Sequence, residues 1–472
     1  MDHEHLYVRV ANRITDMIDN GTFKVGDRVP SIRELSRQAS VSINTVKEAY
    51  TYLEDRRFIE ARPQSGFYVC PKPLAAPSEP EIVREKVSPS KISTGELVVR
   101  VMRDVLERDK IQFGAAIPDP ALVPTAKLSR ILASEIRHHK EESTRYSIPP
   151  GNPLLRSQIS QWMIKAGCTL NPDEIVITAG ASEAVFLSLQ AICRPGDTVA
   201  ISSPIYFNFI QMLKLLDLRV VEIPNSPREG LHLESLRRAI KSHDITCCLV
   251  VSNYDNPLGS CMSNERKQEL VELLNSVNIT LIEDDINGDL CHQGDRPSVA
   301  KAWDRQGNVV LCSSFSKTLA PGYRIGWVAP GKYTEEVMRL KLTTGIGVAS
   351  PTQLAVAEFL KNGGYLHHLR AIRKAYAAKI AKMTEAISEY FPGGTRVSRP
   401  KGGFTLWLEM AEKIDGVSMY AQAVKSGITL APGSLFSLSN NYRNCIRLNG
   451  AFWCEENRWA VKRLGEIAAA QL

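Results

Sequence analysis

Residues 313–327 read SSFSKTLAPGYRIGW, and they directly follow the apolar run VVLC at residues 309–312. A short continuous apolar run rich in branched side chains predicts a strand buried in a parallel sheet. Polar side chains that follow such a strand are expected at its carboxyl end, where open α/β sheets bind their ligands. This stretch therefore predicts an α/β fold with a ligand site directly after residue 312.

The same stretch contains the groups that a phosphorylated carbonyl cofactor needs. The amine of Lys317 can form a Schiff base with a carbonyl, and the Ser314 hydroxyl and the Arg324 guanidinium suit a phosphate. A loop lysine taken alone is more often a solvated surface charge. Support for Lys317 must therefore come from the rest of the chain.

Length and composition exclude several classes of protein. A chain of 472 residues predicts two or three domains, and 44% hydrophobic with 23% charged residues is an ordinary globular composition. The chain has no apolar run near the length of a membrane span and begins with charged residues, so we expect a soluble cytoplasmic protein. The ten cysteines form no C-x-x-C pair, which favours buried reduced thiols over disulfides or a metal site.

Residues 1–70 have the pattern of a winged helix-turn-helix. Apolar residues recur at helical spacing over residues 6–18, Ser31 is placed to cap a helix over residues 32–39, and Ser42 is placed to cap a third helix. Residues 58–61 and 66–69 then alternate like the two strands of a wing. The expected DNA contacts are Ser31, Arg33, Ser42, Asn44, Thr45, Lys47, Arg62 and Gly66.

Charge lends this DNA hypothesis little support. The chain carries a net charge of +7, but residues 1–70 hold equal numbers of acidic and basic side chains. Two helices joined by a short turn also occur in ordinary helical packing, so pattern alone must carry the hypothesis.

The rest of the chain divides into a linker and a large domain. Residues 71–92 are rich in proline and lack amphipathic periodicity, which predicts an extended tether. Residues 93–472 are expected to form one domain, with a large subdomain over 120–345 and a smaller α+β subdomain from 93–119 and 346–472. Seven strands of a mostly parallel sheet are predicted in the large part, at residues 174–178, 198–201, 219–223, 247–252, 279–283, 309–312 and 325–329.

Further candidates for a cofactor site follow other strands of this sheet. Gly180, Ala181 and Ser182 form a strand-to-helix turn whose amides could bind a phosphate. Tyr206 offers a ring for stacking on a heteroaromatic cofactor, although a half-buried packing role is the more common one for such a tyrosine.

Two polar side chains suit the cofactor's ring. Asn256 could donate to a phenolate oxygen, and Asp284 could pair with a protonated ring nitrogen and so make the ring an electron sink. An acidic doublet is usually a surface feature, but this one directly follows an apolar strand.

These motifs carry a resemblance to known families. NPLG, EDD and SFSKTLAPGYRIGW, in this order, resemble the fold-type I pyridoxal-phosphate (PLP) aminotransferases over most of the large domain. GDRVPSIREL, VSINTV and RPQSGFYV resemble the GntR-type winged helix. The two joined by a linker look like the MocR subfamily of bacterial regulators.

The resemblance implies a role for each residue of the site. Lys317 would form the Schiff base with PLP and move the Cα proton, Asp284 would pair with the ring nitrogen, and Asn256 would bond the 3-hydroxyl. The implied phosphate ligands are Ser182, Ser314, Arg324 and the amides of Gly180 and Ala181, with Tyr146 reaching the phosphate of the neighbouring subunit and Arg447 binding a substrate carboxylate.

One departure bears on catalysis. The family has a tyrosine after the EDD motif that bonds the 3-hydroxyl, whereas this chain has Ile286, followed by Asn287. Isoleucine cannot donate a hydrogen bond, whereas Asn287 can if the register is one residue longer. Loss of this bond argues against efficient transamination more than against cofactor binding.

The predicted function is a PLP-dependent transcriptional regulator. It would form a head-to-tail homodimer, bind a double-stranded DNA operator, and sense PLP or an amino acid or amine effector. Two alternatives stay open: an active aminotransferase with an accessory DNA-binding domain, and a DNA-binding protein whose cofactor domain only dimerises it.

Overall fold

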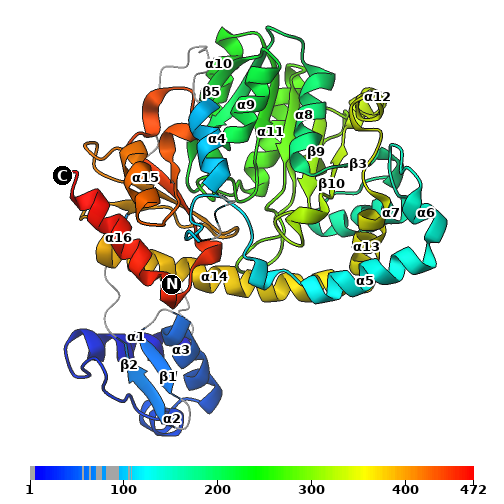
Figure 1. Ribbon diagram of the computed structural model, residues 1–472. Helices are drawn as coiled ribbons and strands as arrows, with labels where there is room; N and C mark the ends of the chain where they lie inside the picture. The colour runs from blue at the N-terminus through cyan, green and yellow to red at the C-terminus, as the bar shows by residue number, and fades with distance from the viewer. Residues whose placement is uncertain are drawn as a thin grey trace. The chain divides into compact units, whose positions relative to one another are not determined.

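The computed structural model describes residues 6–55, 58–62, 65–70, 77–80, 95–104, 107 and 109–472. The chain divides into two compact units, Met1–Ala76 and Pro77–Leu472, each described here by itself (Figure 1).

The N-terminal unit is three helices followed by a hairpin. Ser31 accepts a hydrogen bond from the Glu34 amide at 3.3 Å, and Ser42 accepts one from the Thr45 amide at 3.1 Å, so both predicted caps are confirmed. Apolar side chains from all three helices meet in one core, with Ala11, Val46 and Leu53 fully buried. The elements are α1 Leu6–Asp19, α2 Ile32–Ala39, α3 Ile43–Asp55, β1 Ile59–Arg62 and β2 Gly66–Val69.

The hairpin is the predicted wing. β1 and β2 pair antiparallel, with Ile59 opposite Val69. The backbone of Arg28 forms an isolated antiparallel β-bridge with Tyr68. Gly66 has a φ of +114°, and a Cβ at this position would collide with the Arg28 guanidinium. The turn into β2 therefore requires glycine.

The C-terminal unit is built on an eight-stranded sheet with the strand order β3-β10-β9-β8-β7-β4-β5-β6. The seven predicted strands are all present, and the central ones are parallel. The prediction of seven was one short, because β6 is only two residues and carries no periodic signal. The strands are β3 Val176–Thr178, β4 Thr198–Ser203, β5 Arg219–Ser226, β6 Gly230–Leu231, β7 Ile245–Val250, β8 Thr280–Asp284, β9 Val309–Ser314 and β10 Gly326–Ala329.

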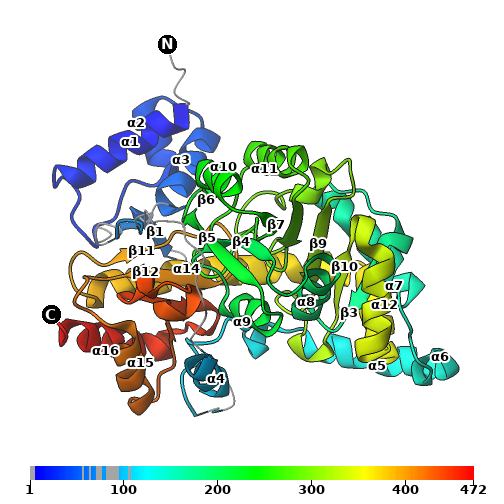
Figure 2. The ribbon, with the colours of Figure 1, turned by 90° about the horizontal axis from the view of Figure 1, so that it is seen from above.

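Helices cover both faces of this sheet, as Figure 2 shows. α8 (Ala181–Ile192) and α9 (Phe207–Leu215) pack on one face, where their apolar side chains join Val199 and Leu249 in one core cluster. α10 (Leu233–Ser242) and α11 (Asn264–Ser276) pack on the other face. Two-sided coverage explains why the strands are apolar throughout rather than alternating.

A four-stranded antiparallel sheet, in the order β11-β12-β14-β13, forms the smaller part of this unit. Helix α14 (Gly364–Tyr390) connects the two parts, because Tyr365 and Leu369 belong to the core of the large sheet and Met383 and Ile387 to the core of the small one (Figure 1). The small strands are β11 Arg396–Val397, β12 Thr405–Glu409, β13 Ala431–Pro432 and β14 Cys445–Asn449.

The remaining α-helices surround these two sheets. They are α4 Gly95–Arg103, α5 Thr125–His138, α6 Lys140–Thr144, α7 Pro153–Met163, α12 Thr334–Gly345, α13 Ser350–Lys361, α15 Gly416–Lys425 and α16 Arg458–Ala469. Helix α4 ends at Arg103, and residues 105, 106 and 108 lie outside the described residues. Within the described part of the chain, no helix has the length and apolar character needed to cross a bilayer.

Residues 77–80 of the predicted linker are held against the C-terminal unit. The carbonyl of Ser78 accepts from the Val397 amide at 2.9 Å, and that of Pro77 accepts from the Arg399 guanidinium at 2.9 Å. Glu79 forms an ion pair with Arg228, on the turn between β5 and β6. The chain that leaves the winged helix is thus fixed at this point to both the large and the small sheet.

Candidate functional site at the carboxyl edge of the large sheet

Three strand ends bring the expected cofactor residues to one edge of the large sheet. β8 ends at Asp284 and its parallel neighbour β9 ends at Ser314. β10 runs antiparallel to β9, with Gly326 opposite Ser314, so Arg324 lies at the same edge. The SSFSKTLAPGYRIG stretch is therefore a turn that leaves and re-enters the sheet at the ligand-binding end.

Lys317 is half-buried at this edge, and its Nζ donates a hydrogen bond to the carbonyl of Ala116 at 2.5 Å. Burial lowers the pKa of its amine to about 8, and the charges of Arg447 and Arg324 act in the same direction while Asp284 opposes them. A larger fraction of this amine is therefore unprotonated near neutral pH than of a solvent-exposed lysine. Lys317 is therefore nucleophilic under conditions where a surface lysine is not.

The pKa of Asp284 is shifted in the opposite direction to that of Lys317. Its Oδ1 accepts from the Ile286 amide at 3.1 Å, and burial together with the charge of Asp285 raises its pKa to about 7. A carboxylate in this position is costly unless a cation pairs with it. The position thus favours a ligand that brings a positive charge.

Ser314 and Arg324 meet at a corner of the site through a third residue, Ser316. The Ser314 hydroxyl lies 2.8 Å from that of Ser316 and accepts from the Ser316 amide at 3.0 Å. Arg324 donates to the Ser316 hydroxyl at 3.4 Å and to the Ala179 carbonyl at 2.5 Å. Ser316 was not predicted, although its position two residues after Ser314 was a usable signal.

The turn before α8 forms the other side of this corner. Gly180 has a φ of +97°, and a Cβ there would occupy the position of the Arg324 guanidinium. Ala181 and Ser182 form the first turn of α8, where free amides and the helix dipole favour an anion. Glu183 accepts from the Ala179 amide at 2.7 Å and pairs with the buried Lys341 at 2.8 Å, which fixes the turn.

Arg447, on β14, closes the site from the small sheet. Its side chain is fully buried and donates to Asn256 Oδ1 at 3.1 Å and to the carbonyl of Gly114. Burial lowers the pKa of its guanidinium to about 10. Its Nε is buried and has no hydrogen-bond partner among the described residues, which leaves a donor available for a ligand.

The other expected residues lie at different positions. Tyr206 is half-buried against Phe207 and Phe209, and the charges of Arg447 and Asp284 act on its phenol, so it lies beside the same site. Tyr146 is 80% exposed, so this single chain does not bring it into the cluster.

At the position of the family's tyrosine, Ile286 contributes no side-chain polar group. The side-chain amide of the next residue, Asn287, donates to the Tyr254 carbonyl at 2.8 Å. This hydrogen bond ties Asn287 to the loop that carries Asn256.

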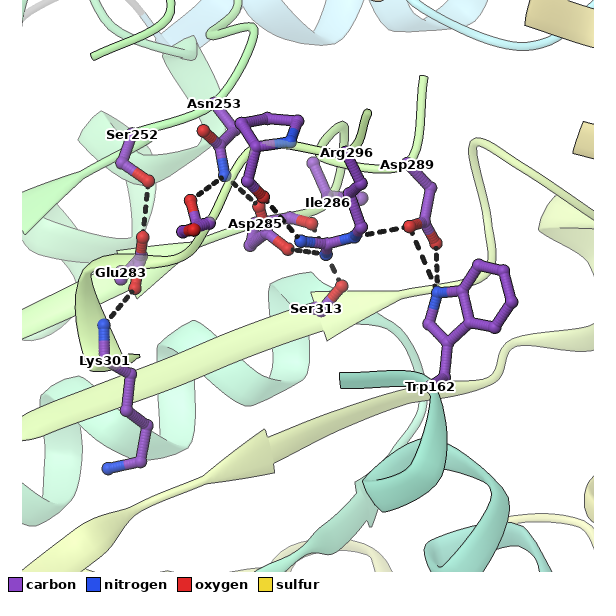
Figure 3. Close-up of polar contacts among 12 residues, drawn as sticks. Trp162, Ser252, Asn253, Glu283, Asp285, Ile286, Asp289, Arg296, Lys301 and Ser313 are labelled. Carbon is purple, nitrogen blue, oxygen red and sulfur yellow. Dashed lines mark hydrogen bonds and ion pairs between the residues drawn. The ribbon is translucent and has the colours of Figure 1, made fainter. Parts of the chain in front are cut away.

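Behind the expected cofactor residues lies a largely buried polar network, drawn in Figure 3. Arg296 forms ion pairs with Asp285 and with Asp289, the latter at 2.5 Å, and Asp285 also accepts from Asn253 at 2.7 Å. Asp289 accepts from the Trp162 indole at 3.0 Å. Asp285 belongs to the EDD motif, but Arg296, Asp289 and Trp162 stand in none of the sequence motifs identified above, and Trp162 lies 127 residues from Asp289.

Most of the expected DNA-binding residues are exposed on the N-terminal unit. Asn44 and Lys47 are exposed on α3, and Arg33 is exposed on α2. Arg62 stacks on the Tyr68 ring at 4.4 Å and pairs with Glu60 at 2.8 Å. These exposed side chains are of the kinds that contact a DNA groove, although Glu60 neutralises part of the positive charge of Arg62.

Two protein families match the chain. Residues 6–69 match the bacterial regulatory proteins of the gntR family, and residues 108–464 match aminotransferase class I and II. The uncharacterized HTH-type transcriptional regulator YdcR of Escherichia coli (strain K12) is 37% identical over 467 residues, covering 99% of both chains.

Solved aminotransferases share the fold of the C-terminal unit. A kynurenine aminotransferase of Pyrococcus horikoshii, in complex with PMP, is 27% identical with a TM-score of 0.75, covering 80% of this chain and 96% of that chain. LysN, an α-aminoadipate aminotransferase of Thermus thermophilus complexed with N-(5'-phosphopyridoxyl)-L-leucine, is 25% identical with a TM-score of 0.73, covering 79% and 95%.

These matches confirm the fold class and the family resemblance derived from the sequence. The chain belongs to the gntR family of bacterial regulatory proteins, in the MocR arrangement of a winged helix-turn-helix followed by an aminotransferase class I and II domain.

Proposed function

We propose that this chain is a cytoplasmic transcriptional regulator that binds DNA through its winged helix and binds PLP covalently at Lys317. The observation that carries the cofactor part is the pair of opposite pKa shifts at one sheet edge, toward an amine with a pKa of about 8 and a carboxyl with a pKa of about 7. A Schiff base needs the first group, and a protonated pyridine nitrogen complements the second.

The remaining polar groups suit the rest of the cofactor. Arg324, Ser314 and Ser316 surround the turn at Gly180, where the start of α8 favours a phosphate. Asn256 faces Arg447 across the site. Bound there, PLP supplies an aldehyde that captures amines reversibly and a ring that withdraws electrons from them.

We propose an amino acid, rather than a simple amine, as the effector. Arg447 is buried, and its unpartnered Nε can donate to a carboxylate. An arginine in such a place binds a carboxylate in a fixed orientation through parallel N–H bonds. An effector without a carboxylate would leave this donor unpaired.

Catalytic turnover is the second candidate function. The intact pair of Lys317 and Arg447 supports it, whereas Ile286 removes one donor to the cofactor and Asn287 is held by Tyr254. Release of a 2-oxo acid on mixing the PLP-loaded protein with amino acids would favour the enzyme. Binding without release would favour the regulator.

The linker contacts suggest how site occupancy reaches the DNA-binding unit. Arg399 holds Pro77 and lies beside Pro400, which packs on Gly259, while Gly402 packs on the ring of Tyr254. Gly259 and Tyr254 belong to the loop that carries Asn256. A shift of this loop on ligand binding would therefore change the contacts that hold residues 77–80 of the linker against the C-terminal unit.

A head-to-tail homodimer is part of the proposal. Tyr146 is 80% exposed, which suits a side chain that completes the neighbouring subunit's phosphate site rather than its own. Dimerisation would also present two winged helices to two half-sites.

Substitutions on α3 should separate affinity from specificity. Lys47→Ala is expected to weaken binding to all DNA sequences alike and to lower the slope of log affinity against log salt by about one. Asn44→Ala is expected to cost about 1–3 kcal/mol at one base position and so relax specificity there. Glu48→Ala is the matched control. It removes an exposed negative charge, of the same sign as the DNA phosphates, beside Lys47, and should leave DNA binding equal or tighter. Equal losses for all three would contradict this assignment.

The regulatory claim is tested by titrating a selected DNA fragment with the full chain, with and without PLP and amino acids. The expected change in DNA affinity is about 5–150-fold, the usual range of coupling between sites. Glu79→Arg, which breaks the ion pair with Arg228, should bind DNA and PLP normally but show less coupling. DNA binding that is indifferent to PLP in the wild-type chain would instead favour the purely dimerising role.

A further inference from the structure

We propose that Tyr365 and Arg296 are positioning residues at the two ends of one buried hydrogen-bonded chain that fixes Lys317 relative to Asp284. The inference rests on the proposed cofactor site. It concerns residues behind that site, none of which touches the cofactor in this proposal.

One end of the chain lies beside Asp284. The next residue, Asp285, is fully buried; its amide donates to the Cys312 carbonyl at 2.8 Å, and its own carbonyl accepts from Ser313 at 3.1 Å. Its carboxylate is clamped by Arg296 and by Asn253 (Figure 3). The backbone that carries Asp284 is thus fixed to β9 and, through Arg296, to the loop beyond.

Arg296 continues the chain to Asp289, which is the shared partner of three donors. Asp289 accepts from Arg296 at 2.5 Å, from the Trp162 indole at 3.0 Å and from the Tyr365 hydroxyl at 2.7 Å. Burial alone would lower the pKa of Arg296, but the charges of Asp285 and Asp289 raise it above its ordinary value. One permanent cation therefore joins the buried carboxylate of Asp285 to the partly buried carboxylate of Asp289.

The other end reaches the residue after the Schiff-base lysine. The Tyr365 hydroxyl lies 2.8 Å from Thr318 Oγ1 as well as 2.7 Å from Asp289 Oδ2. A phenol has one hydrogen, and the carboxylate is the stronger acceptor, so Tyr365 donates to Asp289 and accepts from Thr318. His368, one helical turn along α14, donates to the Thr318 carbonyl at 2.7 Å and holds the same peptide.

The chain accounts for residues that the cofactor chemistry does not use. A buried ion pair is weak evidence for stability by itself, since an apolar replacement is often no less stable. This network instead connects two groups that must keep one distance: the amine that binds the aldehyde and the carboxylate that binds the ring nitrogen. A shift of about 1 Å between such groups is enough to impair a site.

The test is a double-mutant cycle on PLP affinity in the full chain. Tyr365→Phe removes one hydroxyl, and Arg296→Lys keeps the charge but not the two-sided clamp. Each is expected to raise the Kd for PLP about tenfold, and the double variant should be little worse than either single one, because both break the same chain. Tyr376→Phe, the same change at a buried tyrosine farther along α14, is the matched control and should leave the Kd unchanged.

The outcomes separate this inference from the proposed function. Additive effects of Tyr365→Phe and Arg296→Lys, or an equal loss in Tyr376→Phe, would mean general packing and would overturn the inference. If Arg296→Lys fails to fold, Thr318→Val takes its place in the cycle with Tyr365→Phe, and the same outcomes apply. A wild-type chain that binds no PLP would overturn the proposed function and this inference with it.

Discussion

Asp284→Asn is expected to make the cofactor-free protein more stable at pH 8, by up to about 4 kcal/mol, while weakening PLP binding more than a hundredfold. The carboxyl has a pKa of about 7 in the folded chain against an ordinary value of 3.8, and a tenfold change in proton affinity corresponds to about 1.4 kcal/mol. The native state holds this proton more tightly than the unfolded chain does. Stability from this group is therefore lost as pH rises from about 4 to 7.

An asparagine has no proton to lose over that range, so it avoids the decline. It also cannot pair with a protonated ring nitrogen, which would be left buried and uncompensated at a cost of about 3 kcal/mol or more. Thermal unfolding at pH 4 and pH 8 without PLP, followed by PLP titration, checks both effects. Equal stability of the two proteins at pH 8, or an unchanged Kd for PLP, would contradict the assignment of Asp284.

Lys317→Ala is expected to abolish the visible absorption band of the PLP-loaded protein. No Schiff base can form at alanine, whereas the hydrogen bond lost to the Ala116 carbonyl is worth about 1 kcal/mol and the desolvation cost of the amine is removed with it. The variant should therefore remain folded, and any PLP that it binds should be released by dialysis. The measurement is the absorption spectrum before and after dialysis, with circular dichroism to check folding.

Lys267→Arg is the matched control for this experiment. Lys267 is a fully buried lysine whose pKa is also lowered by burial, but it donates to Asn253 Oδ1 at 2.6 Å and to the Ser298 carbonyl at 2.7 Å. Arginine can replace these donors, and it leaves Lys317 intact. If the absorption band survives in Lys317→Ala and disappears in Lys267→Arg, the Schiff base forms at Lys267 instead of Lys317. That result would contradict the proposed function.

Local signals in the sequence were enough to predict much of the fold. Helix α2 was predicted at its observed bounds, because Ser31 and the apolar spacing act within one or two turns. The strands around Lys317 were predicted for the same reason, since each is a continuous apolar run. The two-residue β6 was missed because a strand so short has no pattern.

The site itself was only half predictable. Lys317 follows β9, Asp284 ends β8 and Arg324 directly precedes the antiparallel β10, so the strand topology places all three at one edge. The hydrogen-bonded chain through Arg296, Asp289 and Tyr365 depends on contacts between different elements, such as the one from Tyr365 to Asp289, which lie 76 positions apart. Sequence spacing carries no information about such contacts.

The pKa shifts were likewise beyond the sequence, because they depend on burial and on neighbours brought in by the fold. Arg447 was expected to bind a carboxylate, but its contacts with Asn256 and Gly114 arise only when the small sheet packs against the large one. Tyr146 remains a prediction that only a dimer can test.

A covalent bond between PLP and one lysine underlies every proposal made for the C-terminal unit. Borohydride reduction of the PLP-loaded wild-type chain, followed by peptide mass mapping, measures this bond. We predict a single phosphopyridoxyl group on the peptide that contains Lys317. A group on any other lysine, or on none, would contradict the proposed function.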